Sequence, residues 1–183
     1  MGFKSQEEIK IAVYILSLLL WAREKNYEIW TTSLQKLLFL WFLSENDREI
    51  LETYRAYLYG PYSSKVSEVA DLIKLYGLIE ADDTSWGARL YKIKNNIPEE
   101  LSKLIIQKTA NFQKFLESFE KNNKKYLKNL QRLANLSKIL WLKKMENIHD
   151  INKIKNKLKL YNWKIPKKEL EEIDKKLKSQ EWI

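Results

Sequence analysis

The chain has 183 residues, of which 45% are hydrophobic and 31% are charged, and it contains no cysteine. This length suits one medium domain, or a small domain with an extension, and the hydrophobic content argues against general disorder. The lack of cysteine excludes disulfides and thiolate metal sites, and it favours a reducing cytoplasm as the location.

The net charge of +9 is concentrated in one half of the chain. Residues 1–95 hold 12 Lys/Arg and 13 Asp/Glu, whereas residues 96–183 hold 21 and 11. Residues 121–168 contain 15 basic side chains and only 2 acidic ones. Such a field attracts polyanions, although a solvated, lysine-rich helical surface gives the same pattern. The change near residue 96 divides a predicted N-terminal domain from a basic helical extension.

The first predicted helix begins at Ser5, because a serine followed three residues later by Glu8 forms a capping-box pattern. Apolar residues occupy nearly every face of residues 9–21, so this helix is expected to be central in the core. The run is too short to span a bilayer and lacks the features of a signal peptide, so no membrane partner is expected. A second amphipathic helix is predicted to start within residues 31–33.

The segment between the second and third helices is rich in tyrosine. Residues 53–59 alternate weakly, which indicates either a short strand or an extended arm. Gly60 and Pro61 form a predicted break. Ser63 or Ser64 is then expected to cap the third helix.

A β-hairpin is predicted directly after the third helix. Gly77 is placed as the C-terminal glycine of that helix, and residues 78–81 and 88–93 are predicted to be the two strands. Trp86 lies at the tip of the hairpin, where it is expected to cover the local core, with ligand contact as the alternative. A short helix that ends at a glycine and leads into such a hairpin is typical of a winged helix-turn-helix.

The C-terminal half is predicted to be helical, so the fold class is mainly α. Pro98 suits the first turn of a helix, and Asn122 with Asn123 indicates a break. The helices are expected at approximately residues 98–121, 124–148, 150–161 and 166–178.

Candidate nucleic-acid contacts fall on three predicted elements. Hydroxyls and cations near a helix N-terminus bond phosphates and base edges, and an arginine near a hairpin tip can enter a minor groove. A basic helical stripe can follow a phosphate backbone, but it can equally bind an acidic partner or keep the helix soluble. The candidates are Ser63, Ser64, Lys65 and Ser67 on the third helix, Arg89, Lys92 and Lys94 on the hairpin, and Lys124, Lys125, Lys128 and Arg132 in the extension.

Catalysis finds little support in the residue types. His149 is the only histidine, so a Ser-His triad or a histidine metal site lacks partners, and its position beside Asp150 suggests a helix cap. The chain has no glycine-rich phosphate loop. It is therefore predicted to be a non-enzyme without cofactor or metal, with a nuclease-type carboxylate site as the remaining alternative.

Two separated motifs carry a family resemblance. The stretch Thr-Ser-Leu-Gln-Lys-Leu-Leu-Phe-Leu at residues 32–40 precedes Tyr-Gly-Pro-Tyr-Ser at residues 59–63. This order resembles the YwgA-like and Panacea-domain proteins, in which a KLQKLLYL-type helix precedes an aromatic-Gly-Pro-x-Ser turn. The resemblance covers roughly residues 9–94 and implies a winged-helix-like domain in toxin neutralisation or regulation. The Leu-Tyr-Gly-Leu-Ile segment at residues 75–79 also looks like that of MarR- and PadR-type regulators.

The leading prediction is a cytoplasmic, dimeric regulator that binds double-stranded DNA. Dimerisation through the C-terminal helices would suit two half-sites. The alternative is an antitoxin-like module that binds a partner protein, such as a toxin, and the near-neutral charge of residues 1–95 favours it. RNA as the ligand also remains open, because electrostatics alone do not distinguish it from DNA.

Overall fold

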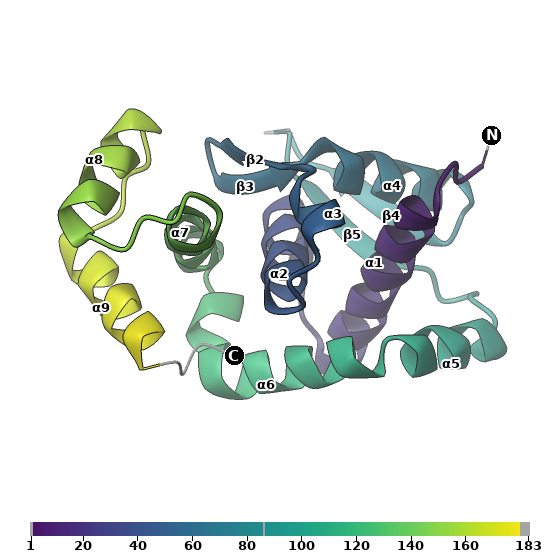
Figure 1. Cartoon of the computed structure of the whole chain (residues 1–183). Helices are drawn as coiled ribbons and strands as arrows, with labels where there is room; N and C mark the ends of the chain where they lie inside the picture. Colours follow the sequence, from purple (N-terminus) through teal and green to yellow (C-terminus); the bar gives the residue numbers. More distant parts are fainter. Residues whose placement is uncertain (1, 86, 180–183) are drawn as a thin grey trace.

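The computed structural model describes residues 2–85 and 87–179. The fold is mainly helical with small antiparallel sheets (Figure 1). The first half contains α1 (Gln6–Lys25), β1 (Ile29–Trp30), α2 (Thr31–Ser44), α3 (Arg48–Leu51), β2 (Tyr54–Tyr57), β3 (Gly60–Ser63), α4 (Ser64–Leu75), β4 (Ile79–Asp83) and β5 (Arg89–Ile93). The second half contains α5 (Glu99–Lys108), α6 (Ala110–Leu127), α7 (Leu130–Leu140), the π-helical turn η1 (Trp141–Met145), α8 (Ile151–Leu160) and α9 (Lys167–Lys178).

The strands form two separate antiparallel sheets. In the larger one β5 is central, with β1 on one side and β4 on the other, so that Tyr91 pairs with both Ile29 and Ala81. The smaller sheet is the β2–β3 hairpin, in which Tyr54 pairs with Ser63. The short β1 strand thus ties the chain before α2 to the hairpin that follows α4.

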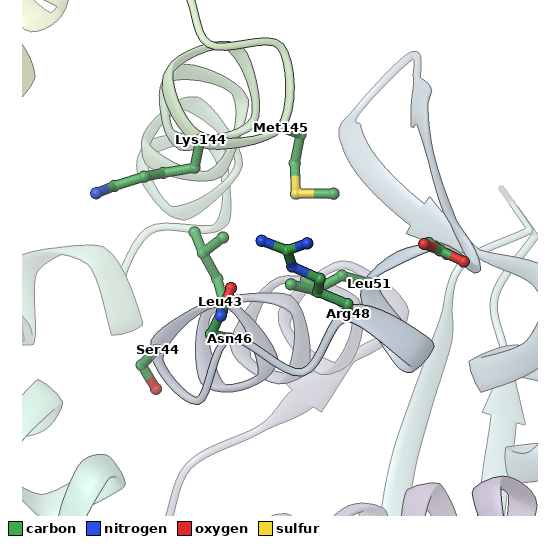
Figure 2. A pocket seen from close by; sticks show the side chains of 8 residues that line it. Leu43, Ser44, Asn46, Arg48, Leu51, Lys144 and Met145 are labelled. Carbon is green, nitrogen blue, oxygen red and sulfur yellow. The ribbon is translucent and has the colours of Figure 1, made fainter.

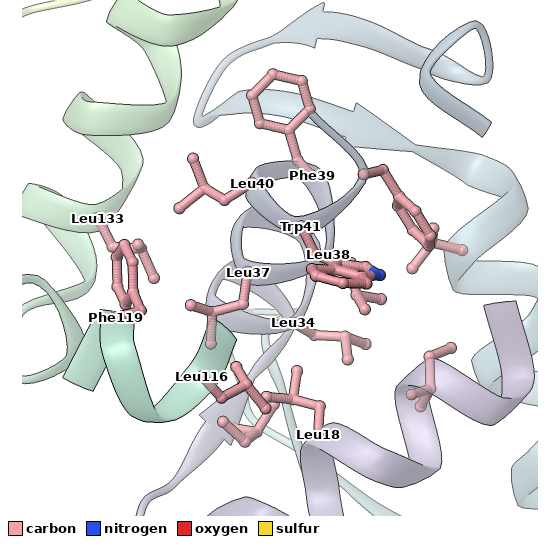
Figure 3. Close-up of a cluster of buried hydrophobic side chains, with 14 of the residues drawn as sticks. Leu18, Leu34, Leu37, Leu38, Phe39, Leu40, Trp41, Leu116, Phe119 and Leu133 are labelled. Atoms are coloured by element: carbon pink, nitrogen blue, oxygen red, sulfur yellow. The ribbon is translucent and has the colours of Figure 1, made fainter. Parts of the chain in front are cut away.

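The core is built around α2. Ten consecutive residues of this helix, 33–42, are buried, so every face of the helix is covered. It contacts α1, α6, α7, β3 and β5. Figure 3 shows Leu34 near Leu18 of α1, whereas Leu37 and Leu40 point toward the side chains of α6 and α7. Burial of these side chains is the main source of stability for such a helix.

The two halves of the chain share this core. The ring of Trp41 in α2 lies 5.2 Å from that of Phe112 and 5.5 Å from that of Phe115, both in α6. Ser17 of α1 also accepts a hydrogen bond from Gln113 Nε2, at 2.6 Å. The charge boundary near residue 96 therefore does not coincide with a gap in the hydrophobic packing.

Several local predictions are confirmed. Ser5 is the N-cap of α1, and its hydroxyl accepts a hydrogen bond from the Glu8 N–H at 3.1 Å. The Glu8 carboxylate accepts the Lys4 N–H, one residue before the cap, so only the Ser5 half of the predicted capping box forms. Gly77 follows α4 with φ of 73°. The expected strand after it pairs with β5. Trp86 lies outside the described residues.

The helix caps differ from the prediction at two positions. The second helix was expected to be capped within residues 31–33, but its N-cap is Trp30 and Ser33 instead accepts the Trp30 N–H at 2.8 Å. At α8 the cap is Asp150, whose carboxylate accepts two backbone N–H groups, whereas the exposed His149 contacts Asn147. A charged oxygen at this position satisfies the helix donors better than an imidazole does.

Two boundary predictions are wrong. Gly60 and Pro61 do not break the chain but begin β3, since a two-stranded hairpin leaves an edge where the missing proline N–H is tolerated. The two long C-terminal helices are divided differently, because Thr109 separates α5 from α6 and Asn129 caps a new helix, α7. The break expected at Asn122 and Asn123 is confirmed as a kink at Asn123, where φ is −134°.

Within the described residues, no helix combines the length and the apolar character needed to cross a membrane.

Gly60 is predicted to be the least replaceable glycine. Its φ is +96°, and an added Cβ would meet Lys138 Cγ at 3.1 Å and the Ala134 carbonyl at 3.4 Å. Gly87 also has a positive φ, of +77°, but open space around it. In urea titrations, Gly60→Ala should lower the free energy of unfolding by ~2–4 kcal/mol and Gly87→Ala by only ~1 kcal/mol. Equal losses would contradict this packing.

Candidate nucleic-acid interface

Ser63 is a structural residue. It is fully buried, its hydroxyl accepts the Val66 N–H at 3.2 Å, and the Thr53 hydroxyl lies 2.7 Å away. The Gln35 amide binds both backbone groups of Ser63, at 3.0 Å each. The expectation that Ser63 contacts nucleic acid is therefore corrected, because a side chain with these partners does not reach the surface.

The first turn of α4 retains few free polar groups. Ser64 is exposed, whereas the Ser67 hydroxyl accepts a hydrogen bond from Gln35 Nε2 at 3.0 Å. Lys65 Nζ lies 2.7 Å from the Glu8 carboxylate of α1. The hydrogen bond from Lys65 holds the pKa of Glu8 below its usual value, so both groups are charged at neutral pH.

Two of the three candidate cations on the β4–β5 hairpin, Arg89 and Lys92, are also paired. Arg89 contacts Asp71 of α4 at 2.5 Å and Asp83 of β4 at 2.8 Å, and the nearby Asp71 carboxylate raises the pKa of Arg89. Lys92 pairs with Asp82 at 3.0 Å. Lys94 is half-buried and has no ion pair among the described residues. These contacts join α4 to the hairpin and compensate most of its positive charge.

The α4–hairpin face consists of α4, β4 and β5 with their exposed side chains. The ion pairs on it that involve the hairpin cations are solvent-exposed. Exposed pairs typically contribute only about 0–1 kcal/mol, so a competing anion can replace the carboxylates at small cost. The face is thus able to exchange internal ion pairs for phosphate contacts, but it has no strong positive field of its own.

The four cations expected on one continuous helix are divided between two helices. Lys124 and Lys125 belong to α6, Lys128 is its C-cap, and Arg132 lies in the first turn of α7. The single helical stripe is therefore a wrong prediction, because Asn129 starts a new helix. Lys125 pairs with Glu172 of α9, whereas the other three have no ion pair among the described residues.

The structure does not bring the two sets of candidates together. In Figure 1, α4 and the C-terminal end of α6 lie on opposite sides of α2. Within a single chain, α2 thus separates α4 from the C-terminal end of α6. A straight duplex on the α4–hairpin face would leave the cations of α6 and α7 free for a second contact.

The sequence analysis did not select three lysines that the structure buries, Lys36, Lys138 and Lys143. Lys143 pairs with Asp174 of α9 at 2.5 Å. Lys36 donates to the Pro61 carbonyl at 2.7 Å without an acidic partner, and Lys138 Nζ lies 5.7 Å from the centre of the Trp163 ring. Burial, with the nearby charge of Lys138, lowers the pKa of Lys36 to about 7. For Lys36, the available signal in the sequence was a charged residue directly before the apolar run of residues 37–43.

A separate cavity of about 500 Å³ lies between the end of α2, α3 and η1. Figure 2 shows Arg48 and Met145 pointing toward one another across it, while the amine of Lys144 points away. Both cations are exposed, and Glu52 also lines the cavity. It therefore contains no buried, uncompensated charge that would mark it as an anion site.

A scan against protein-family models and a search of curated proteins found no match for the chain. The assignment of function therefore rests on the geometry of these residues.

Lys36 should make stability depend on pH. Its folded-state pKa of about 7 lies below the unfolded value near 10.5, so the folded chain binds fewer protons between these limits and stability should rise with pH there. From pH 7 to about pH 9, the wild type should gain roughly 1–2 kcal/mol in free energy of unfolding relative to Lys36→Met. Urea titrations at both pH values measure this, with Lys144→Met as an exposed control that should behave as the wild type.

Proposed function

We propose that residues 1–95 form a winged helix-turn-helix and that the protein binds double-stranded DNA through the α4–hairpin face. The order of elements supports the proposal. The helices α1, α2 and α4 are followed by the β4–β5 hairpin, and β1 pairs with β5 to complete a three-stranded sheet. In this arrangement α4 is the recognition helix, the hairpin is the wing, and α3 with β2–β3 is an insertion. The resemblance to YwgA-like and Panacea-domain proteins belongs to the same proposal.

The proposed contacts differ in kind between the two basic regions. Ser64, exposed at the start of α4, would reach a base edge or a phosphate, while Arg89 and Lys92 would exchange their carboxylates for phosphates. Lys124, Lys128 and Arg132 lie on the other side of the molecule and would hold a flanking or second segment of duplex. Phosphate contacts of both kinds make affinity fall with salt.

A second candidate function is protein binding. It is favoured by the internal ion pairs of the α4–hairpin face and by the large apolar side chains exposed beside them, Leu75 at 69% and Tyr76 at 46%. A partner protein, such as a toxin, would cover these apolar side chains and leave the ion pairs intact. DNA binding is preferred because a winged helix-turn-helix accounts for the position of α4 as the recognition helix and for the hairpin that follows it.

Removal of the competing carboxylates tests the α4–hairpin face. The double variant Asp71→Asn/Asp83→Asn frees Arg89 and should tighten binding to mixed-sequence duplex DNA about 3- to 10-fold at low salt, measured by fluorescence anisotropy. The matched control is Glu99→Gln/Glu171→Gln, which removes two carboxylates paired with Lys103 and Lys167 on other helices. An equal gain for both variants would mean that only net charge matters, and would contradict this face.

The C-terminal cations are tested by their salt dependence. The triple variant Lys124→Ala/Lys128→Ala/Arg132→Ala should bind all duplex sequences more weakly and reduce the slope of log K against log salt by roughly 2–3.

The matched control for this variant removes three exposed lysines from α5 and α6, Lys103, Lys108 and Lys114. It changes net charge equally, so its slope should remain near that of the wild type. An unchanged slope in the first variant would remove Lys124, Lys128 and Arg132 from the interface.

A further inference from the structure

A cavity of about 510 Å³ opens beside the β2–β3 hairpin. Its walls come from the first turns of α2, from the hairpin tyrosines, and from Gly87 and Ala88 in the loop that leads into β5. Small-molecule sites commonly have this size and occur where separate elements meet. The cavity adjoins the α4–hairpin face, because Thr31, which lines it, hydrogen-bonds both backbone groups of Arg89. Gln35 also lines it and holds Ser63 and Ser67.

Among the described residues, Lys36 is the only charged one that lines this cavity. Its side chain is 2% exposed, and one of its three ammonium N–H groups is used by the Pro61 carbonyl. None of the residues that the structure describes places a carboxylate in the cavity wall or forms an ion pair with Lys36. Burial makes the charged form of this amine costly, and an anion supplied from outside the chain would stabilise that form.

A second buried lysine increases this local positive potential. Lys138 of α7 is 3% exposed and has no ion pair among the described residues. A Cβ placed on Gly60 would lie 3.1 Å from Lys138 Cγ and 3.5 Å from Lys36 Cε, so both side chains pack against the same glycine. Lys138 lines a different cavity, on the other side of Tyr59. The two lysines thus lie close to one another around Gly60, but they line separate cavities.

Tyrosines form the outer wall of the Lys36 cavity. Tyr57 and Tyr59 are 62% and 58% exposed, and the rings of Tyr57 and Tyr62 have centroids 5.5 Å apart. Exposed aromatic faces of this kind stack against planar rings. The cavity therefore combines a cation at its inner end with aromatic surface at its opening.

We infer that this cavity binds a small planar anion, an aromatic ring that carries one carboxylate or phosphate, with the anionic group at Lys36 and the ring against the tyrosines. A small ligand fits better than a DNA backbone, because a phosphate of an intact duplex does not reach a side chain that is 2% exposed. The inference does not depend on the DNA-binding function, since the site is formed without nucleic acid.

The test is isothermal titration calorimetry of the full chain with benzoate and with AMP, in the absence of nucleic acid. Benzamide and adenosine are the neutral counterparts. At least one anion should bind, and its neutral counterpart should bind at least about tenfold more weakly, because the charge-assisted contact is lost. Benzoate binding without AMP binding identifies a carboxylate ligand, and the reverse identifies a phosphate ligand. Failure of both anions to bind, or equal binding of the neutral compounds, overturns the inference.

Variants locate the site. Lys36→Met should weaken binding of the anion at least about tenfold, whereas Lys138→Met, which removes an equally buried lysine from the neighbouring cavity, should change it less than about threefold. Tyr57→Ala alters an exposed residue that lines the Lys36 cavity and not the neighbouring Lys138 cavity, so the variant should fold and bind severalfold more weakly. Wild-type affinity in both Lys36→Met and Tyr57→Ala, or a larger loss in Lys138→Met, overturns the assignment to this cavity.

Discussion

Complete burial of α2 is the constraint on which the remaining structure depends. A helix covered on every face brings its polar side chains into the interior, where each requires a partner. Gln35 forms hydrogen bonds with both backbone groups of Ser63, which positions the end of β3 and the N-cap of α4. Lys36 donates a hydrogen bond to the Pro61 carbonyl in the same strand. Gln35 and Lys36 of α2 therefore position the hairpin, the start of α4 and the cavity between them.

Local patterns predicted much of the fold, because their causes are local. The Ser5 cap of α1, the positive φ of Gly77 and the β4–β5 hairpin each depend on a few neighbouring residues. The strand that begins at Gly60 was missed, since a glycine and a proline are ordinarily signals of a break, and only pairing with β2 overrides them. The division at Asn129 was missed because charge periodicity continued across it.

The candidate site was predictable as a set of residues but not as a surface. The sequence identifies Arg89 as a cation on a hairpin, yet its partners Asp71 and Asp83 are separated from it in the chain and meet it only through folding. The same holds for the approach of Lys36 and Lys138 around Gly60, which requires α2, β3 and α7 to pack together. Long-range contacts thus decide which charges are compensated, whereas composition gives only the near-neutral total of residues 1–95.

The central claim is that duplex DNA binds through phosphate contacts, and its salt dependence is the most direct test. Fluorescence anisotropy of the full chain with a mixed-sequence duplex library, at about 50 mM and about 200 mM salt, measures it. The account predicts binding at the lower concentration that weakens at least about tenfold at the higher one. Absence of binding at the lower concentration would contradict the DNA-binding function, and the search would then turn to a protein partner of the α4–hairpin face.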